Sequence, residues 1–113
     1  MARKNKAEAV KRSTEAGCAP EPWLKPEVEE ELELRLRRLS GQLGGIGRMV
    51  REHRKCEEII LQLASARAAL GEIMGLLLEE HLTTCVAERI RQGKVEEPIR
   101  EFARALRFAV RNS

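Results

Sequence analysis

The chain has 113 residues, which leaves room for one modest domain, so any large buried core would have to come from oligomerisation. Aromatic residues make up only 3% of the chain and charged residues 35%, a mixture typical of long helices whose polar faces carry alternating charges. The net charge of +3 is compatible with a nucleic-acid partner but is too small to predict one by itself.

Residues 1–26 show no sustained apolar period, carry Lys and Arg throughout, and end in a stretch that is broken by three prolines. We interpret this segment as a mobile basic N-terminal arm. Residues 27–113 are predicted to form a helical domain. Pro26 suits the first turn of its first helix, where a missing N–H costs nothing.

The apolar residues of the first predicted helix recur at alternating steps of four and three, which is the heptad rhythm of a helix seam. They are Leu32, Leu36, Leu39, Leu43, Ile46 and Val50. Four glycines between positions 41 and 47 each cost about 1 kcal/mol relative to Ala in a helix, so a loop is the alternative. The apolar rhythm stays in phase on both sides of the glycines, which favours a helix. The polar stretch at 52–55 is the predicted turn.

The second predicted helix is the longest element and continues to about Arg91, where Gly93 ends it. Its apolar stripe consists of Ile59, Leu63, Ala66, Leu70, Ile73 and Leu77. A third helix starts near Val95 with Pro98 in its first turn, and its stripe consists of Val95, Ile99, Phe102, Leu106 and Val110. The chain is therefore predicted to be all-α.

Three cysteines are present, and no apolar run of about 18 or more residues or signal peptide is recognisable. We therefore expect a soluble cytoplasmic protein that has no membrane partner. In a reducing compartment its cysteines are better explained as free thiols, metal ligands or redox sensors than as a disulfide framework.

His81 and Cys85 lie four residues apart near the end of the second helix, so a regular α-helix places them on one face. This pair alone is a weak signal, since a half-buried helix end gives the same pattern. Cys56 begins the helix, roughly 37 Å from His81 at 1.5 Å per residue, so one straight helix cannot close a site. Two copies packed antiparallel would bring Cys56 of one protomer to the His81–Cys85 pair of the other. Two thiolates and one imidazole suit Cu(I), whereas structural zinc usually takes four ligands.

Three motifs, RLRRLSGQLGGIGRMV, QLASARAAL and LLLEEHLTTCV, together with a lone Cys56 after a short polar turn, resemble the copper-sensitive operon repressor family over about residues 32–110. This family also includes nickel/cobalt, formaldehyde and persulfide sensors. Its copper branch is similar in having one Cys followed by HxxxC, which here are Cys56, His81 and Cys85. Formaldehyde sensors lack the last Cys, persulfide sensors lack the His, and the additional His residues of nickel/cobalt sensors are not found at this N-terminus.

The resemblance implies a three-helix protomer, an antiparallel dimer that forms a helical bundle, and a flat homotetramer that binds operator DNA without a helix-turn-helix. It implies that Glu101 hydrogen-bonds to the ring nitrogen of His81 that faces away from the metal, with a solvated surface charge as the alternative. Lys55 stands where copper sensors of the family often have Tyr. The implied DNA-binding residues are Arg35, Arg37, Arg38, Arg48 and Arg51, whose guanidinium groups suit phosphate oxygens.

The resulting hypothesis is a Cu(I)-responsive transcriptional repressor that binds operator DNA as the apo-protein and releases it on copper binding. Two alternatives stay open. One is a thiol-based repressor that senses persulfide or another reactive sulfur species through Cys56 and Cys85 of facing protomers. The other is a helical copper-buffering or adaptor protein without DNA binding. An enzyme is not expected, because no base is paired with a nucleophile outside the proposed ligands.

Overall fold

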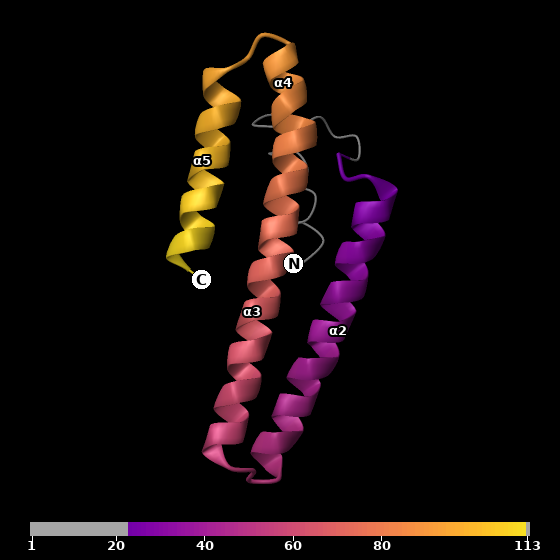
Figure 1. Ribbon diagram of the computed structural model, residues 1–113, viewed down its shortest axis with the longest axis vertical. Coiled ribbons are helices and arrows are strands. Elements are labelled where there is room, and N and C mark those ends of the chain that lie inside the picture. Colours follow the sequence, from indigo (N-terminus) through magenta and orange to yellow (C-terminus); the bar gives the residue numbers. More distant parts are fainter. Residues whose placement is uncertain (1–22, 113) are drawn as a thin grey trace, which may run out of the picture.

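The structure, a computed structural model, describes residues 23–112, and these residues are almost entirely helical (Figure 1). The elements in chain order are α2 (Pro26–Arg51), α3 (Cys56–His81), the π-helix η1 (Leu82–Val86), α4 (Ala87–Arg91) and α5 (Glu96–Arg111). Helices α3, η1 and α4 follow one another without a break and form one long rod. The described residues therefore form three rods, namely α2, the continuous helix Cys56–Arg91 and α5. The prediction of an all-α, three-helix protomer is confirmed.

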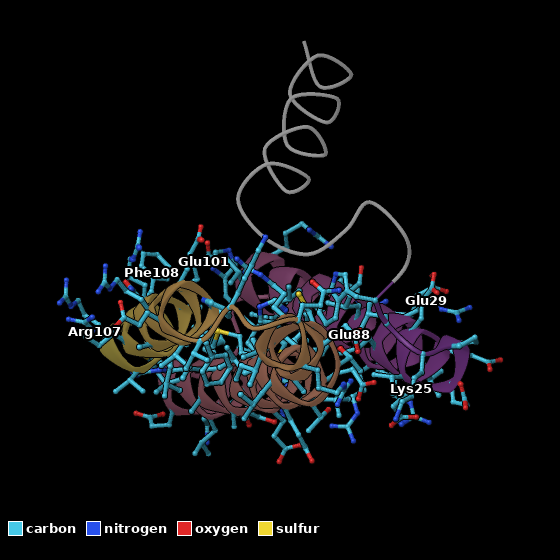
Figure 2. All side chains as sticks on the ribbon, turned by 90° about the horizontal axis from the view of Figure 1, so that it is seen from above. Lys25, Glu29, Glu88, Glu101, Arg107 and Phe108 are labelled. Atoms are coloured by element: carbon cyan, nitrogen blue, oxygen red, sulfur yellow. The ribbon has the colours of Figure 1, made fainter. Side chains whose placement is uncertain are left out.

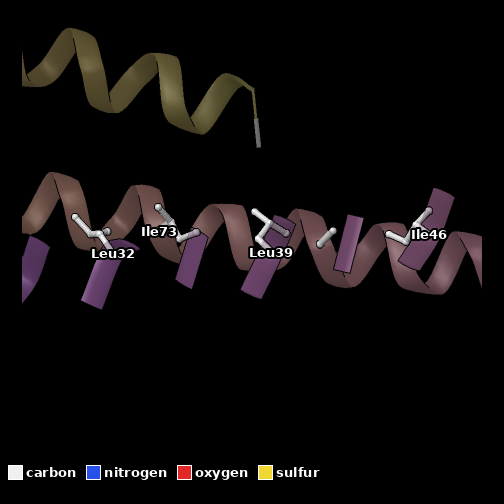
Figure 3. Packing of buried hydrophobic residues seen from close by; sticks show 5 residues of the cluster. Leu32, Leu39, Ile46 and Ile73 are labelled. Carbon is white, nitrogen blue, oxygen red and sulfur yellow. The ribbon is translucent and has the colours of Figure 1, made fainter. Parts of the chain in front are cut away.

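Helices α2 and α3 pack antiparallel along nearly their whole length (Figure 1). The core between them consists of residues spaced seven apart on each helix, namely Leu32, Leu39 and Ile46 on α2 with Ala66 and Ile73 on α3 (Figure 3). Pro26 occupies the first turn of α2, and the helix runs unbroken through its glycines. The helical prediction for the glycine-containing stretch is therefore confirmed, because regularly spaced apolar contacts on both sides outweigh the local glycine cost.

The turn between α2 and α3 has no Gly or Pro, and the structure explains how it forms. His53 adopts a left-handed conformation with φ 54°. Its N–H donates to the carbonyl of Val50 and the N–H of Arg54 donates to the carbonyl of Met49. These two bonds are those of a Schellman motif, which normally places Gly at this left-handed position. The predicted turn at 52–55 is confirmed, with a histidine in the place that glycine usually takes.

On α2 and α3, about half of the apolar stripe is buried within the protomer. The second heptad set on each helix remains exposed, and it consists of Leu36, Leu43 and Val50 on α2 and Leu63, Leu70 and Leu77 on α3. These six residues, here called the open seam, lie beside the buried core residues at positions that a coiled-coil-like bundle would cover. One protomer therefore buries one side of the seam and presents the other.

The continuous helix Cys56–Arg91 corrects the expectation that the chain has no apolar stretch of about 18 residues. It contains an 18-residue window with a mean hydropathy of 1.4, long and apolar enough to cross a membrane by length and composition, and 11% of this window is buried. Arg67 and Glu72 are the charged residues between positions 59 and 78. A helix that supplies two apolar sides to a bundle acquires the same composition, so this finding is weak support for a membrane span.

Helix α5 returns antiparallel beside the upper half of the long rod, on the side away from α2 (Figure 1). Gly93, with φ 93°, supplies the left-handed residue that ends α4. Pro98 is buried in the first turn of α5, as the sequence predicted. An ion pair between Arg89 and Glu101 at 2.6 Å ties α4 to α5. This docking places α5 next to the end of α3 that carries His81.

Candidate metal centre

His81 is the last residue of α3, and Cys85 lies within the π-helix that follows. The threonines of this turn bond to the preceding backbone: the Thr84 hydroxyl donates to the Glu80 carbonyl at 2.6 Å and the Thr83 hydroxyl to the Glu79 carbonyl at 3.0 Å. Hydroxyls bonded in this way compete with the helical N–H groups, which suits a locally widened turn. Single π-turns inside α-helices occur often at functional sites. The histidine and the cysteine therefore remain neighbours along a helix whose pitch changes between them.

The His81 ring is packed between two aromatic side chains. The Trp23 ring meets it edge-on with centroids 5.1 Å apart, and the Phe102 ring of α5 is stacked with centroids 6.4 Å apart. Cys85 is buried, with 6% of its surface exposed. Its sulfur is engaged in a disulfide, so metal binding by this residue requires reduced protein. At this end of α3 the imidazole therefore has an aromatic ring as a neighbour on each of two elements, the segment before α2 and α5.

Burial lowers the pKa of His81 below its ordinary value. The Glu101 carboxylate opposes this effect and the Arg89 guanidinium adds to it. Because a metal binds the neutral imidazole, a lowered pKa keeps the ring in its ligating form at neutral pH.

Glu101 has a partner on α4 in addition to its charge effect on His81. Its carboxylate accepts a 2.6 Å hydrogen bond from Arg89, whose side chain is 11% exposed, and Glu97 lies 3.9 Å from the same guanidinium. Glu101 is near enough to act on His81 through its charge. The hydrogen bond from Arg89 to Glu101 therefore ties α4 to α5, the helix that supplies Phe102 beside His81.

Cys56 occupies the opposite end of α3. It is a free, exposed cysteine on the first residue of the helix, directly after the turn. With 1.5 Å per residue, Cys56 and His81 are separated by roughly 37 Å along the helix axis. Within residues 23–112 no group of three potential ligands lies close enough to hold a metal ion. A single protomer therefore keeps Cys56 apart from the other two proposed ligands, as the sequence geometry requires.

The five arginines expected to contact DNA differ in how free they are. Arg35 is ion-paired with Glu31 at 2.9 Å and with Glu72 of α3 at 3.4 Å. The other four are exposed and form no ion pair with another residue of the described range; they are Arg37, Arg38, Arg48 and Arg51. The charge of Arg35 is thus partly neutralised by its own chain.

Trp23 falls within the predicted basic arm, and the sequence pattern does not predict its contact with His81. Residues 1–22 of that arm, including Cys18, lie outside the described part of the chain, but Trp23 and Leu24 are half-buried against the helices. Trp23 is the only tryptophan of the chain, and a large aromatic residue in an otherwise polar segment is the one sequence feature that could have indicated a packed position. Its contact with His81 joins residues far apart in the sequence, so no local pattern predicted it.

Comparison with known proteins adds a family assignment to this geometry. Residues 29–107 match the profile of the family described as metal-sensitive transcriptional repressor. The copper-sensing transcriptional repressor CsoR of Bacillus subtilis is 37% identical over 74 residues, which are 66% of this chain and 73% of that protein. RicR of Mycobacterium tuberculosis, also a copper-sensing transcriptional repressor, is 39% identical over 59 residues, which are 52% of this chain and 62% of RicR.

Two solved structures are similar in fold. The copper-sensing repressor CsoR with Cu(I) from Geobacillus thermodenitrificans gives a TM-score of 0.71 at 36% identity, covering 74% of this chain and 88% of that one. The nickel-responsive transcriptional regulator InrS gives a TM-score of 0.65 at 32% identity, covering 71% of this chain and 90% of that one. The similar structures thus include sensors of two different metals.

Proposed function

Because the chain belongs to the family of metal-sensitive transcriptional repressors, which are regulators and not enzymes, we propose that the metal to which it responds is Cu(I). The apo-protein binds operator DNA in the cytoplasm, and the copper-bound protein releases it. The observation that carries this proposal is the separation of one exposed cysteine from a packed His81–Cys85 pair by the length of a single helix.

The open seam supports an antiparallel dimer as the unit that completes the site. It leaves six large aliphatic side chains exposed, each worth roughly 1.5 to 3 kcal/mol when buried. A second α2–α3 pair packed against it would form a four-helix bundle. In an antiparallel arrangement the start of one α3 lies beside the end of the other, so Cys56 of one protomer reaches the partner's His81 and Cys85. Two such dimers would form the proposed homotetramer.

The donor set favours copper over nickel. Two cysteine sulfurs and one imidazole are soft or borderline ligands, which suit Cu(I) at low coordination number, whereas Ni(II) prefers more ligands in square-planar or tetragonal geometry. Residues 23–112 contain one further histidine, His53, which lies in the α2–α3 turn. With Cys56 exposed and the imidazole kept neutral, these side chains fit Cu(I), which would link the two subunits when bound.

Metal binding and DNA binding are coupled in this proposal. If Cu(I) lowers the affinity for operator DNA by some factor, operator DNA must lower the affinity for Cu(I) by the same factor, with typical coupling free energies of about 1 to 3 kcal/mol. On α2, Arg37, Arg48 and Arg51 are spaced to lie on one exposed face, which makes them the strongest candidates for phosphate contacts on this helix.

The test uses reduced full-length protein and the DNA upstream of its own gene, labelled with fluorescein. Fluorescence anisotropy should report binding by the apo-protein and release when Cu(I) is added, but no release with Ni(II). Cys56→Ala should bind the DNA equally well and no longer respond to Cu(I). Cys56→Ala that still releases DNA on copper addition would overturn the proposed ligand set. Release by persulfide in metal-free wild-type protein, without a response to Cu(I), would instead assign a reactive sulfur signal.

A further inference from the structure

Helix α5 carries four arginines in a single narrow stripe. Arg100, Arg104, Arg107 and Arg111 follow one another at steps of four, three and four, so on a helix they lie on one face. All four are exposed, and together with Phe108 they line a shallow groove. Arg107 and Phe108 lie on the outer side of α5, away from α2 (Figure 2). We call these five residues the α5 stripe.

The charges of the α5 stripe are not neutralised by other described residues. The acidic residues of α5 are Glu96, Glu97 and Glu101, and the last two face Arg89 of α4. Residues 102–112 contain no Asp or Glu. None of the four stripe arginines forms an ion pair within residues 23–112, unlike Arg35 on α2. Binding of an anion here would therefore break no ion pair among the described residues.

The geometry points to the phosphate backbone of duplex DNA as the partner of the α5 stripe; we infer a second DNA-contacting surface besides that on α2. The stripe extends over roughly 16 Å at 1.5 Å per residue. Phosphates follow one another at about 3.4 Å per strand along the duplex axis, so an extended row of guanidinium groups suits several of them. Arginine is well matched to phosphate because its planar fork of donors binds two oxygens at once.

This inference rests on the proposed function, since a DNA partner is taken from it, but it adds a surface on the opposite side of α3. Backbone contacts carry no sequence information, so the α5 stripe would raise affinity for any duplex and hold the protein in register. An anionic membrane is the competing partner for a basic amphipathic helix. It is less favoured because Phe102, in the middle of the apolar stripe of α5, is partly buried and stacks on His81, so the stripe cannot enter a bilayer as a whole while α5 stays docked, although Ile99, Leu106 and Val110 are exposed.

The experiment compares two variants of the reduced, metal-free, full-length protein that lose the same charge. Arg104→Gln/Arg107→Gln removes the middle of the α5 stripe, and Arg91→Gln/Lys94→Gln removes two exposed cations near the α4–α5 junction. Gln is about as good a helix former as Arg, so both variants should fold, which circular dichroism verifies. The probe is a fluorescein-labelled duplex of random sequence, titrated between about 50 and 200 mM salt.

The stripe variant should bind DNA more weakly than wild type, and the slope of log K against log salt should become shallower by about 2, since each phosphate contact contributes about 0.9. The junction variant should keep the wild-type slope. Equal slopes for the two variants would overturn the α5 stripe and leave the repressor proposal intact. If the wild type binds neither this duplex nor its own upstream DNA, the repressor proposal itself fails. Loss of binding to phosphatidylserine vesicles in the stripe variant, with DNA binding unchanged, would assign the stripe to membranes and refute the inference.

Discussion

The two ends of α3 each carry a proposed metal ligand, but they are built differently. At the C-terminal end, His81 is packed by Trp23 and Phe102, and the Arg89–Glu101 pair fixes the adjoining helix. At the N-terminal end, Cys56 is exposed and follows a turn held by two backbone hydrogen bonds. One protomer therefore has a packed imidazole at one end of α3 and an exposed thiol at the other.

This difference shows where subunit assembly matters for a metal site of the proposed kind. Side chains that are already ordered lose little conformational entropy when a ligand binds, so the His81 end needs no partner to position its ring. Cys56 gains fixed neighbours only if another chain packs beside it. The open seam, which lies between the two ends, is the feature that would bring such a chain into place.

The largest expected effect comes from separating the two ends genetically. Cys56→Ala and Cys85→Ala homodimers should each lose high-affinity Cu(I) binding, because every site lacks one ligand. Unfolding and refolding an equal mixture should restore about a quarter of the wild-type sites, since half of the dimers are mixed and each mixed dimer holds one intact site. Competition with a colorimetric Cu(I) chelator measures this recovery. Absence of recovery despite mixed dimers would show that the two ends do not meet across subunits.

Disrupting the open seam should prevent the dimer that brings Cys56 of one protomer to His81 of the other. Leu70→Glu places a charge at the centre of the seam, and losing two buried leucines per dimer costs about 3 kcal/mol or more, a rise in the dimer dissociation constant of about a hundredfold. Analytical ultracentrifugation should show smaller species. Ser65→Glu, on an exposed face of the same helix, is the control and should keep the wild-type assembly. Identical sedimentation of the two variants would mean that the seam does not hold subunits together.

Loosening the enclosed end should have a smaller effect. Glu101→Gln weakens the ion pair with partly buried Arg89 and should destabilise the protein by about 1 to 3 kcal/mol. It should also lower the pKa of His81 further, because the Glu101 carboxylate raises that pKa. Chemical unfolding and the NMR titration of His81 measure these two effects. Glu88→Gln, which breaks an exposed pair with Arg91, should change stability by less than about 0.5 kcal/mol.

Acidification should lower the free energy of unfolding through His81. The pKa of His81 is lower in the folded protein than in the unfolded chain, because burial disfavours the charged ring. The stabilising contribution is therefore complete above the ordinary pKa of about 6.5 and is lost as the pH falls through the lowered folded value. Urea unfolding of apo-protein between about pH 7.5 and pH 5 tests this decline. A His81→Gln variant should decline less over that range, and an equal decline would refute the assignment to His81.

The smallest effect is expected at the turn before Cys56. His53→Gly removes the cost of a left-handed side-chain-bearing residue, and should stabilise the protein by about 1 kcal/mol. Gly93→Ala at the matching position after α4 should destabilise it by a similar amount. Thermal unfolding measures both changes. The affinity for Cu(I) should stay unchanged in His53→Gly, since the turn sets the position of the helix start and not the chemistry of the thiol.

The sequence by itself determined the helices and the separation of the ligands. Apolar residues at steps of three and four define α2, α3 and α5, because a helix places those positions on one side whatever it packs against. The distance from Cys56 to His81 follows from helical rise alone. The family resemblance, carried by the motifs around these residues, agrees with the matching family profile.

Tertiary structure alone decided which half of each apolar stripe is buried and what surrounds the imidazole. Leu32 and Leu36 are equivalent in the heptad pattern, yet α3 covers the first and leaves the second exposed. Trp23 reaches His81, and Glu101 bonds to Arg89, because helices distant in sequence pack together. Periodicity gives the direction of a side chain relative to its own helix axis, whereas its neighbours depend on how the axes are arranged, which is settled by the packing of the whole chain.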